Sequence, residues 1–200
     1  MVRPRSQGSK HIATVFLLCE GEETEPNYFR GVIPRQSSIS IEYNPDRRHH
    51  DRNDVIGLKE WASDIMRDPQ FRPGRDKIWI VLDKDENSID RLKNVCNWCE
   101  KNDVGIAFSN PCFEYWLLLH FRYDESGQNK EDLYSTLGDL IGHRYQKNGD
   151  YSGLFKGMTD VATKNAKKVR NGISRDDYCS HNPFTSVDLL IRDVMERQRS

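Results

Sequence analysis

The chain has 200 residues, enough for one domain with a substantial core, and its 30 Lys and Arg against 31 Asp and Glu give a formal net charge of −1. This balance excludes a uniformly basic nucleic-acid binder, and 36% hydrophobic with 30% charged residues excludes a disordered chain. Because we find neither a signal-peptide pattern nor an apolar run near the roughly 18 residues of a membrane span, we expect a cytoplasmic protein without a membrane partner. Five cysteines without an evident pairing pattern are expected to be reduced thiols.

Apolar runs and helical patterns alternate along the first 122 residues. The first run, at 11–19, leads into a tight turn that Gly21 permits, and Thr24 is the expected N-cap of the helix that follows, with Pro26 in its first turn. Strands are expected at 11–19, 38–43, 77–82 and 104–108, and helices at 24–34, 54–66, 88–101 and 112–121. This alternation is typical of a mostly parallel sheet that helices cover on both faces.

Beyond residue 122 the sequence predicts helices only. These are expected at about 130–141, 158–169 and 185–197, with polar loops at 145–157 and 170–183. We therefore predict an α/β core with a four-stranded sheet over residues 8–122. A helical C-terminal extension over residues 123–200 is expected to pack on this core.

Acidic residues follow two of the expected strands directly. Glu20 ends the first apolar run, and Asp83 and Asp85 end the run at 77–82. The carboxyl ends of parallel strands meet at one edge of a sheet, where ligands of open α/β sheets bind. If the two strands are neighbours, Glu20 lies about 4–6 Å from Asp83 or Asp85, and the three carboxylates suit one or two Mg²⁺ or Mn²⁺ ions. The alternative is that Asp85 and Asn87 cap the next helix while Glu20 lies in a loop.

Together these segments resemble a known family. Glu20-Gly21 after one strand and Asp83-x-Asp85 after a later one resemble the Toprim domain, the metal-binding module of topoisomerases, primases and OLD-family nucleases. The longer segments at 19–29 (CEGEETEPNYF), 83–85 (DKD) and 109–121 (SNPCFEYWLLLHF) resemble the RloB-like family, which is found with bacterial anti-phage and abortive-infection loci. The resemblance continues more loosely at 145–147, 165–166 and 182–185.

The resemblance implies a Toprim-like core and metal-dependent cleavage of nucleic acid. By this analogy Glu20 is a metal ligand or general acid/base, and Asp83 and Asp85 are metal ligands. The leading hypothesis is a Mg²⁺- or Mn²⁺-dependent nuclease that hydrolyses phosphodiester bonds of DNA or RNA in anti-phage defence (abortive infection). The alternative is a non-catalytic nucleic-acid- or nucleotide-binding regulatory subunit that partners an ATPase. The oligomeric state, a homodimer included, stays open.

Further polar residues are candidates for supporting roles. Glu114 lies in an otherwise apolar segment, where an unpaired carboxylate is costly, so it either pairs with a base or reaches the metal site. Asn110 and Glu25 are candidates for hydrogen bonds that support the metal ligands, or for contacts with the substrate. Lys147 is a phosphate contact by resemblance alone, and otherwise a surface lysine. Candidates for holding a nucleic-acid backbone are Arg47, Arg48, Arg52, Lys164, Lys167 and Lys168.

Other chemistry is disfavoured. The chain has no G-x-x-x-x-G-K-[ST] segment, which excludes NTP hydrolysis by a P-loop. An EF-hand starting at Asp83 fails because Ser88 and Asn94 stand where glycine and glutamate are required. The Cys96-x-x-Cys99 pair lies in an expected helix without a second pair, which disfavours a zinc site.

Overall fold

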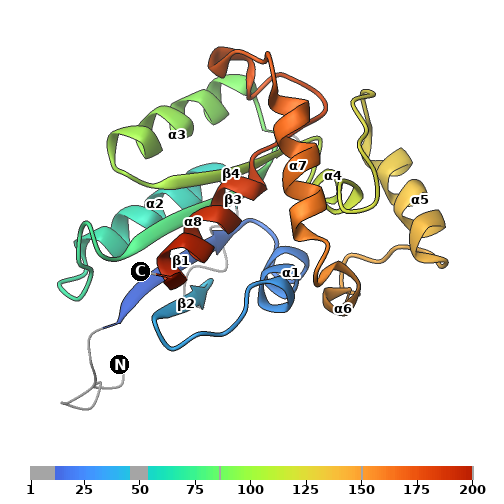
Figure 1. The fold of residues 1–200 in the computed structure, drawn as a ribbon. Coiled ribbons are helices and arrows are strands. Elements are labelled where there is room, and N and C mark those ends of the chain that lie inside the picture. The colour runs from blue at the N-terminus through green and yellow to red at the C-terminus, as the bar shows by residue number, and fades with distance from the viewer. Residues whose placement is uncertain (1–11, 46–53, 86, 150, 200) are drawn as a thin grey trace.

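The computed structural model describes residues 12–45, 54–85, 87–149 and 151–199. One five-stranded sheet with the order β2-β1-β3-β4-β5 forms its centre (Figure 1). Its first four strands pair in parallel and β5 is antiparallel to β4, which confirms the predicted mostly parallel α/β architecture. The strands are β1 (Ala13–Cys19), β2 (Ile39–Tyr43), β3 (Lys77–Asp83), β4 (Gly105–Asn110) and β5 (Phe184–Thr185).

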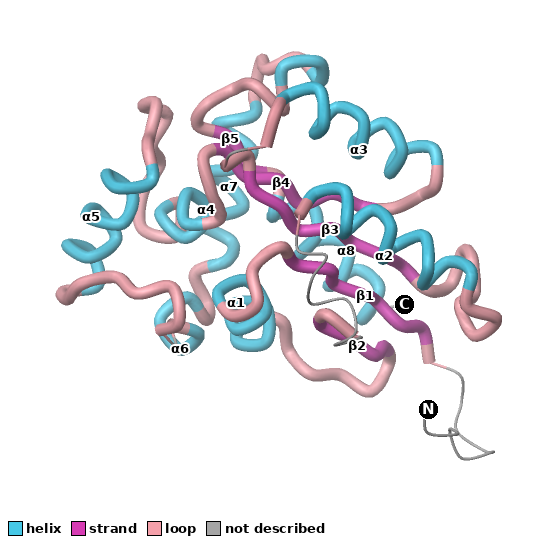
Figure 2. The backbone as a smooth tube through the Cα atoms, turned by 180° about the vertical axis from the view of Figure 1, so that it is seen from behind, coloured by secondary structure: helices cyan, strands magenta, loops and turns pink. Residues whose placement is uncertain are grey.

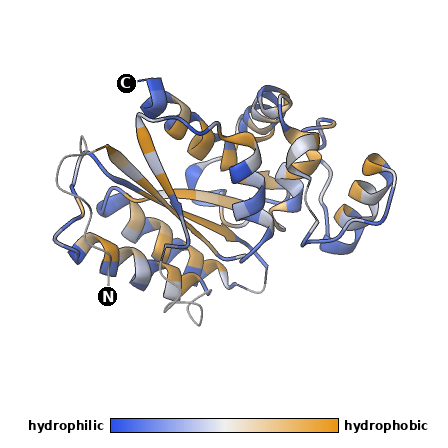
Figure 3. Cartoon of the chain, turned by 90° about the horizontal axis from the view of Figure 1, so that it is seen from below, coloured by the Kyte–Doolittle hydropathy of each residue, from blue (hydrophilic) through white to orange (hydrophobic). Residues whose placement is uncertain are grey.

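Helices cover both faces of the sheet (Figures 1 and 3). One face packs against α2 (Val55–Arg67) and α3 (Ile89–Lys101). The other packs against α1 (Thr24–Val32), α4 (Glu114–Leu118), α7 (Thr159–Arg170) and α8 (Val187–Arg199), and outside it lie α5 (Lys130–Ile141) and α6 (Ser152–Phe155) (Figure 2). A short 3₁₀ helix, η2, spans Arg175–Asp177. Within the described residues, every helix is too short or too polar to cross a membrane.

The alternation of side chains along the central strands divides the core into two clusters. On β3, Ile78 and Ile80 face the α2–α3 layer, whereas Trp79 and Val81 face the layer of α1, α4 and α8. Both faces are buried, which is why this strand reads as a continuous apolar run in the sequence. Trp79 also donates an indole hydrogen bond to Asp193 Oδ2 at 2.8 Å, which fixes α8 across β3.

Four details of the prediction are wrong. The sheet has five strands because β5, expected at the boundary between a loop and a helix, pairs with the end of β4. A two-residue strand is too short to show the alternation of apolar and polar residues by which strands are recognised in a sequence. The expected helix at 112–121 is the five-residue α4 followed by turns, since an apolar segment reports burial rather than helix length. The expected loop at 145–157 contains α6, and Glu23, without a side-chain cap bond, replaces Thr24 as the N-cap of α1.

His120 anchors the α1–α4 contact as a neutral side chain. It is buried, with Nδ1 3.0 Å from Trp116 O and Nε2 2.9 Å from the Tyr28 hydroxyl. A carbonyl only accepts, so Nδ1 carries the proton and Nε2 accepts from Tyr28. Burial lowers the pKa of His120 to about 4.

We expect His120 to lower the stability of the protein as pH drops from about 6.5, where an unfolded histidine titrates, to about 4. In this window the unfolded chain binds a proton that the folded chain excludes, which costs about 3 kcal/mol at the acid end. The raised pKa values of Glu20, Glu25 and Asp83 act in the opposite direction over this range. His120→Gln should remove the contribution of His120, so that the urea unfolding free energy at pH 4.5, relative to that at pH 7.5, rises by about 2–3 kcal/mol. An unchanged difference between the two pH values in the variant would contradict this role of His120.

Candidate active site

The carboxyl ends of β1 and β3 lie side by side at one edge of the sheet. Cys19 pairs with Val81 in the parallel register, and the next backbone N–H, that of Glu20, donates to Val81 O at 3.0 Å. The half-buried Glu20 carboxylate turns back and accepts the Asp83 backbone N–H at 3.1 Å. Two strands distant in sequence therefore deliver Glu20 and Asp83 to one point.

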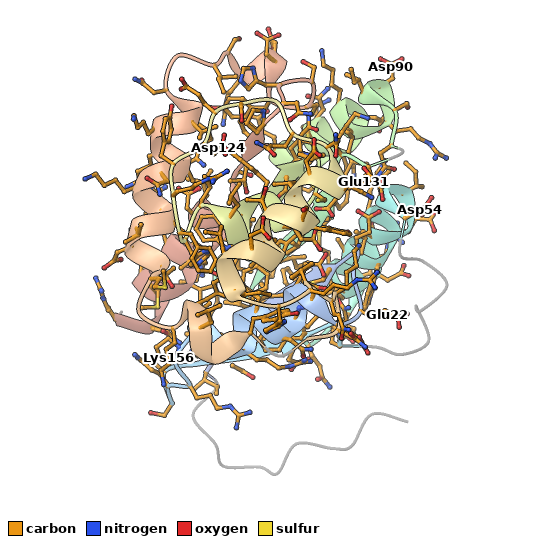
Figure 4. All side chains as sticks on the ribbon, turned by 90° about the vertical axis from the view of Figure 1, so that its right-hand side faces the viewer. Glu22, Asp54, Asp90, Asp124, Glu131 and Lys156 are labelled. Carbon is orange, nitrogen blue, oxygen red and sulfur yellow. The ribbon has the colours of Figure 1, made fainter. Side chains whose placement is uncertain are left out.

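Two further carboxylates converge on this edge from helix starts. Glu25 lies in the first turn of α1 and is 5% exposed, and Glu114 opens α4 and is 1% exposed. Together with the half-buried Asp83 they line one cavity of about 290 Å³. The remainder of this acidic cavity is lined by Gly21, Glu22, Glu23, Thr24, Phe113 and Lys147. Figure 4 looks toward this end of the molecule, with Glu22 of the β1–α1 loop labelled.

The carboxylates around the acidic cavity raise one another's pKa, because each disfavours the ionised form of its neighbours. Desolvation, followed by the charges of Glu25, Glu114 and Glu20, raises the pKa of Asp83 well above its usual range. Burial and then the charge of Glu114 raise the pKa of Glu25 to about 7. Desolvation also raises the pKa of Glu20, against the hydrogen bond from the Asp83 backbone. The cavity therefore gathers carboxyl groups whose ionised forms nearby protein groups compensate only in part.

Lys147 supplies positive charge at the rim of the acidic cavity. The Thr24 hydroxyl donates to Lys147 O at 2.6 Å and ties this residue to the start of α1, 123 positions away in sequence. The Lys147 ammonium lies 6.0 Å from the centre of the Tyr134 ring. Although partial desolvation acts against it, Glu114 and Tyr134 raise the pKa of Lys147, which stays a cation.

Gly21 allows the Glu25 carboxylate to approach the β1–α1 loop. A Cβ atom at position 21 would lie only 2.6 Å from Cδ of Glu25. From the sequence, the glycine is expected to permit a tight turn. The structure adds a second reason, because the Glu25 carboxylate occupies the space that a side chain at position 21 would need.

Gly21→Ala is expected to push the Glu25 carboxylate away from the acidic cavity. Because the displaced atoms end a side chain, the unfolding free energy should change by less than about 1 kcal/mol. The rate of any reaction in the cavity should fall on the order of 10-fold. Gly153→Ala is the matched control, since nothing lies within 4 Å of a Cβ there. Melting temperature and the rate of that reaction, measured together, check this, and an unchanged rate would contradict it.

The other predicted site residues lie apart from the acidic cavity. Asp85 is exposed and forms an ion pair with Lys130 of α5. Asn110 is buried and donates to His181 O at 2.7 Å, which secures the β4–β5 corner. Arg47, Arg48 and Arg52 fall outside the described residues. Lys164, Lys167 and Lys168 are exposed on α7, with Lys168 3.6 Å from the Tyr123 ring centre.

Sequence reasoning missed two residues that shape the site. The Tyr145 hydroxyl donates to Glu114 Oε1 at 3.0 Å, and Lys130 neutralises Asp85. Tyr145 stands two positions before Lys147 in a segment that already resembled the family, which is the one signal that could have indicated it. Nothing in the sequence pattern indicated Lys130.

The donor chemistry of the acidic cavity fits a hard divalent cation. Carboxylate oxygens are the ligands that Mg²⁺ and Mn²⁺ prefer, and such an ion would relieve the repulsion among Glu25, Asp83 and Glu114. Their present spacing is that of a cavity rather than a closed ligand shell: in the part of the chain that the structure describes, no three His, Cys, Asp or Glu side chains are arranged to hold a metal ion.

Comparison with known proteins identifies one family. The family model described as RloB-like protein matches residues 15–194, from β1 into α8. No curated protein matches the chain, and no solved structure does. The match begins within β1, covers most of the chain and includes the residues around the acidic cavity, and the chain therefore belongs to the RloB-like protein family.

Proposed function

We propose that the protein is a Mg²⁺- or Mn²⁺-dependent nuclease that hydrolyses phosphodiester bonds at the acidic cavity, in a cytoplasmic anti-phage defence role. The observation that carries this proposal is the convergence of Glu25, Asp83 and Glu114 on one cavity with Lys147 at its rim. A purely structural cluster would leave these carboxylates poorly compensated, at a cost in stability. A Toprim-like core is the finer fold assignment that accompanies the proposal. It is supported by Glu20 and Asp83 at adjacent strand ends.

Each residue has a distinct part in the proposed reaction. Glu25, Asp83 and Glu114 would hold the cation, which when bound polarises a phosphoryl oxygen and makes water a stronger nucleophile. Lys147 is placed to attract a substrate phosphate to the rim of the cavity. Glu20 holds the Asp83 backbone in position, and Tyr145 orients Glu114. The exposed lysines of α7, Lys164, Lys167 and Lys168, are candidates for contacts with the flanking nucleic-acid backbone.

The test is incubation of the pure protein with plasmid DNA, single-stranded RNA and tRNA in Mg²⁺, Mn²⁺ or EDTA. We expect cleavage of at least one substrate in metal and none in EDTA. Glu114→Gln should lower the rate on the order of 100-fold, because it removes a charge from the cavity. Asp90→Asn, at an exposed carboxylate of α3, should leave the rate unchanged. Cleavage that persists in EDTA or in Glu114→Gln would contradict the assignment.

The second candidate function is a binding subunit that partners an ATPase. It is favoured by the net charge of −1, which is unusual for a protein that grips nucleic acid by itself. Failure to cleave any of these substrates, alone and with a co-expressed ATPase, would select this alternative.

A further inference from the structure

A second cavity, of about 590 Å³, lies between α5 and the chain that follows it. Gly142, with a φ of +79°, ends α5 in a left-handed conformation and turns the chain back, so that residues 143–145 face the helix across Gly138. The cavity is lined by Tyr134, Ser135, Gly138, Asp139, Gly142, His143, Arg144 and Tyr145. We call it the aromatic cavity.

Aromatic rings of three residues of this cavity and of the neighbouring Tyr151 form a continuous series. The ring centres of Tyr134 and Tyr145 are 5.4 Å apart, and Tyr145 is stacked on Tyr151 at 5.4 Å with an angle of 23° between the ring planes. His143 is stacked on the other end of this series, 6.0 Å from Tyr151. Tyr134, His143 and Tyr145 are among the residues that line the cavity, and Arg144 stands exposed beside them. Because Tyr145 is itself buried between its neighbours, the rings left to meet a ligand are those of the half-buried Tyr134 and the exposed His143, next to a cation.

The aromatic and acidic cavities share their dividing wall. Tyr145 lines the aromatic cavity, while its hydroxyl bonds Glu114 in the acidic cavity at 3.0 Å. Tyr134 lines the aromatic cavity too, while Lys147 over its ring lines the acidic one. The two spaces are therefore separated by the thickness of single side chains, which suits two parts of one extended ligand.

We propose that the aromatic cavity binds an unpaired base of the nucleic acid whose phosphodiester lies at the acidic cavity, so that the substrate is single-stranded at that point. This inference rests on the proposed nuclease function. A base stacks on aromatic side chains through its π face, whatever its identity, whereas the bases of an intact duplex are already stacked and paired. Arg144 and Lys147 lie on either side of Tyr145 in sequence and supply cations for the adjoining phosphates.

The test measures binding separately from cleavage. Asp83→Asn protein, which keeps the nucleic acid intact, is titrated into oligonucleotides that carry the fluorescent base 2-aminopurine. Single-stranded DNA and single-stranded RNA form two arms, and the matching duplexes form the competitors. We expect quenching of the fluorescent base on binding of at least one single strand, and on the order of 10-fold weaker binding of its duplex.

Substitutions at one ring separate stacking from packing. In the same background, Tyr134→Ala should weaken single-strand binding on the order of 10-fold, because one stacking surface is lost. Tyr134→Phe should retain the binding, since it keeps the ring. Tyr178→Ala is the matched control and should bind as the parent protein does. Tyr178 is a half-buried tyrosine that packs on Phe184 in the core cluster on the other face of the sheet. Circular dichroism of each variant verifies that it is folded.

Two results overturn the inference: equal affinity for duplex and single strand, or unchanged binding by folded Tyr134→Ala protein. Both are compatible with metal-dependent cleavage, so they remove the single-strand preference and leave the nuclease proposal in place. Ring-dependent quenching by a protein that cleaves no substrate has the opposite meaning: it supports base binding at the aromatic cavity and removes the nuclease proposal.

Discussion

An Asp83→Asn variant is expected to lower the rate of the proposed metal-dependent cleavage on the order of 100-fold or more and to unfold at a higher temperature than the unsubstituted protein. The two effects have one cause. Asp83 sits in a partly desolvated position beside the carboxylates of Glu25, Glu114 and Glu20, all of which raise its pKa. The asparagine amide has nearly the same shape, without the charge that these neighbours repel.

The expected gain in unfolding free energy is about 0.5–2 kcal/mol, typical of relieved strain at a functional site. Thermal unfolding in EDTA at pH 7.5 measures it, and single-turnover cleavage in Mg²⁺ measures the loss of activity. Asp103→Asn is the control, because this exposed aspartate forms its ion pair with Lys77 at the opposite end of β3. A less stable Asp83→Asn protein would mean that the carboxylate is compensated within the fold, which would undermine the metal proposal.

Arg170→Met is expected to cost about 3–5 kcal/mol of unfolding free energy, the largest stability effect that we predict. Arg170 of α7 contacts the two carboxylate oxygens of Asp188 at 2.5 and 2.6 Å and also donates to Thr185 O at 2.6 Å. Asp188 is 1% exposed, so loss of the guanidinium leaves a buried charge without its partner. The Thr185 carbonyl of β5 loses a donor at the same time.

Urea unfolding of a matched set of variants tests this expectation. Arg197→Met breaks a more exposed ion pair, that between Arg197 and Asp193 within α8, and should cost at most about 1 kcal/mol of unfolding free energy. Adding Asp188→Asn to Arg170→Met should recover part of the loss, because the uncompensated charge is gone. An equal loss in Arg170→Met and Arg197→Met would place the effect in packing by the arginine side chain rather than in the buried charge.

The sequence predicts those parts of the fold that neighbouring residues determine. The first four strands and α2, α3, α5 and α7 follow from apolar runs and helical periods, because each buries a face along its whole length. The placement of Glu20 beside Asp83 followed from the rule that parallel strand ends share an edge. Both inferences use only local pattern together with a general rule of topology.

Contacts across long separations in sequence could not be predicted in this way. Asp85 follows the same strand as Asp83, yet it pairs with Lys130, which no period or motif links to it. Lys147 reaches the acidic cavity because Thr24 holds its carbonyl, and Glu114 lines the cavity because its helix begins there. Side chains that meet through the fold leave no shared pattern in the chain, so resemblance to a family was the one guide to Lys147.

The pairing of β5 with β4 has a consequence for the order of events during synthesis. β4 leads directly into α4 and Glu114, but its Ser109 and Asn110 are paired with Thr185 and Phe184, about 75 positions later. A nascent chain has therefore made every carboxylate of the acidic cavity long before the strand that closes the sheet leaves the ribosome. Until then the free edge of β4 is a template for non-native pairing. We expect chains stalled before residue 184 to be protease-sensitive around residues 105–118, and chains that also include α8 to become resistant there.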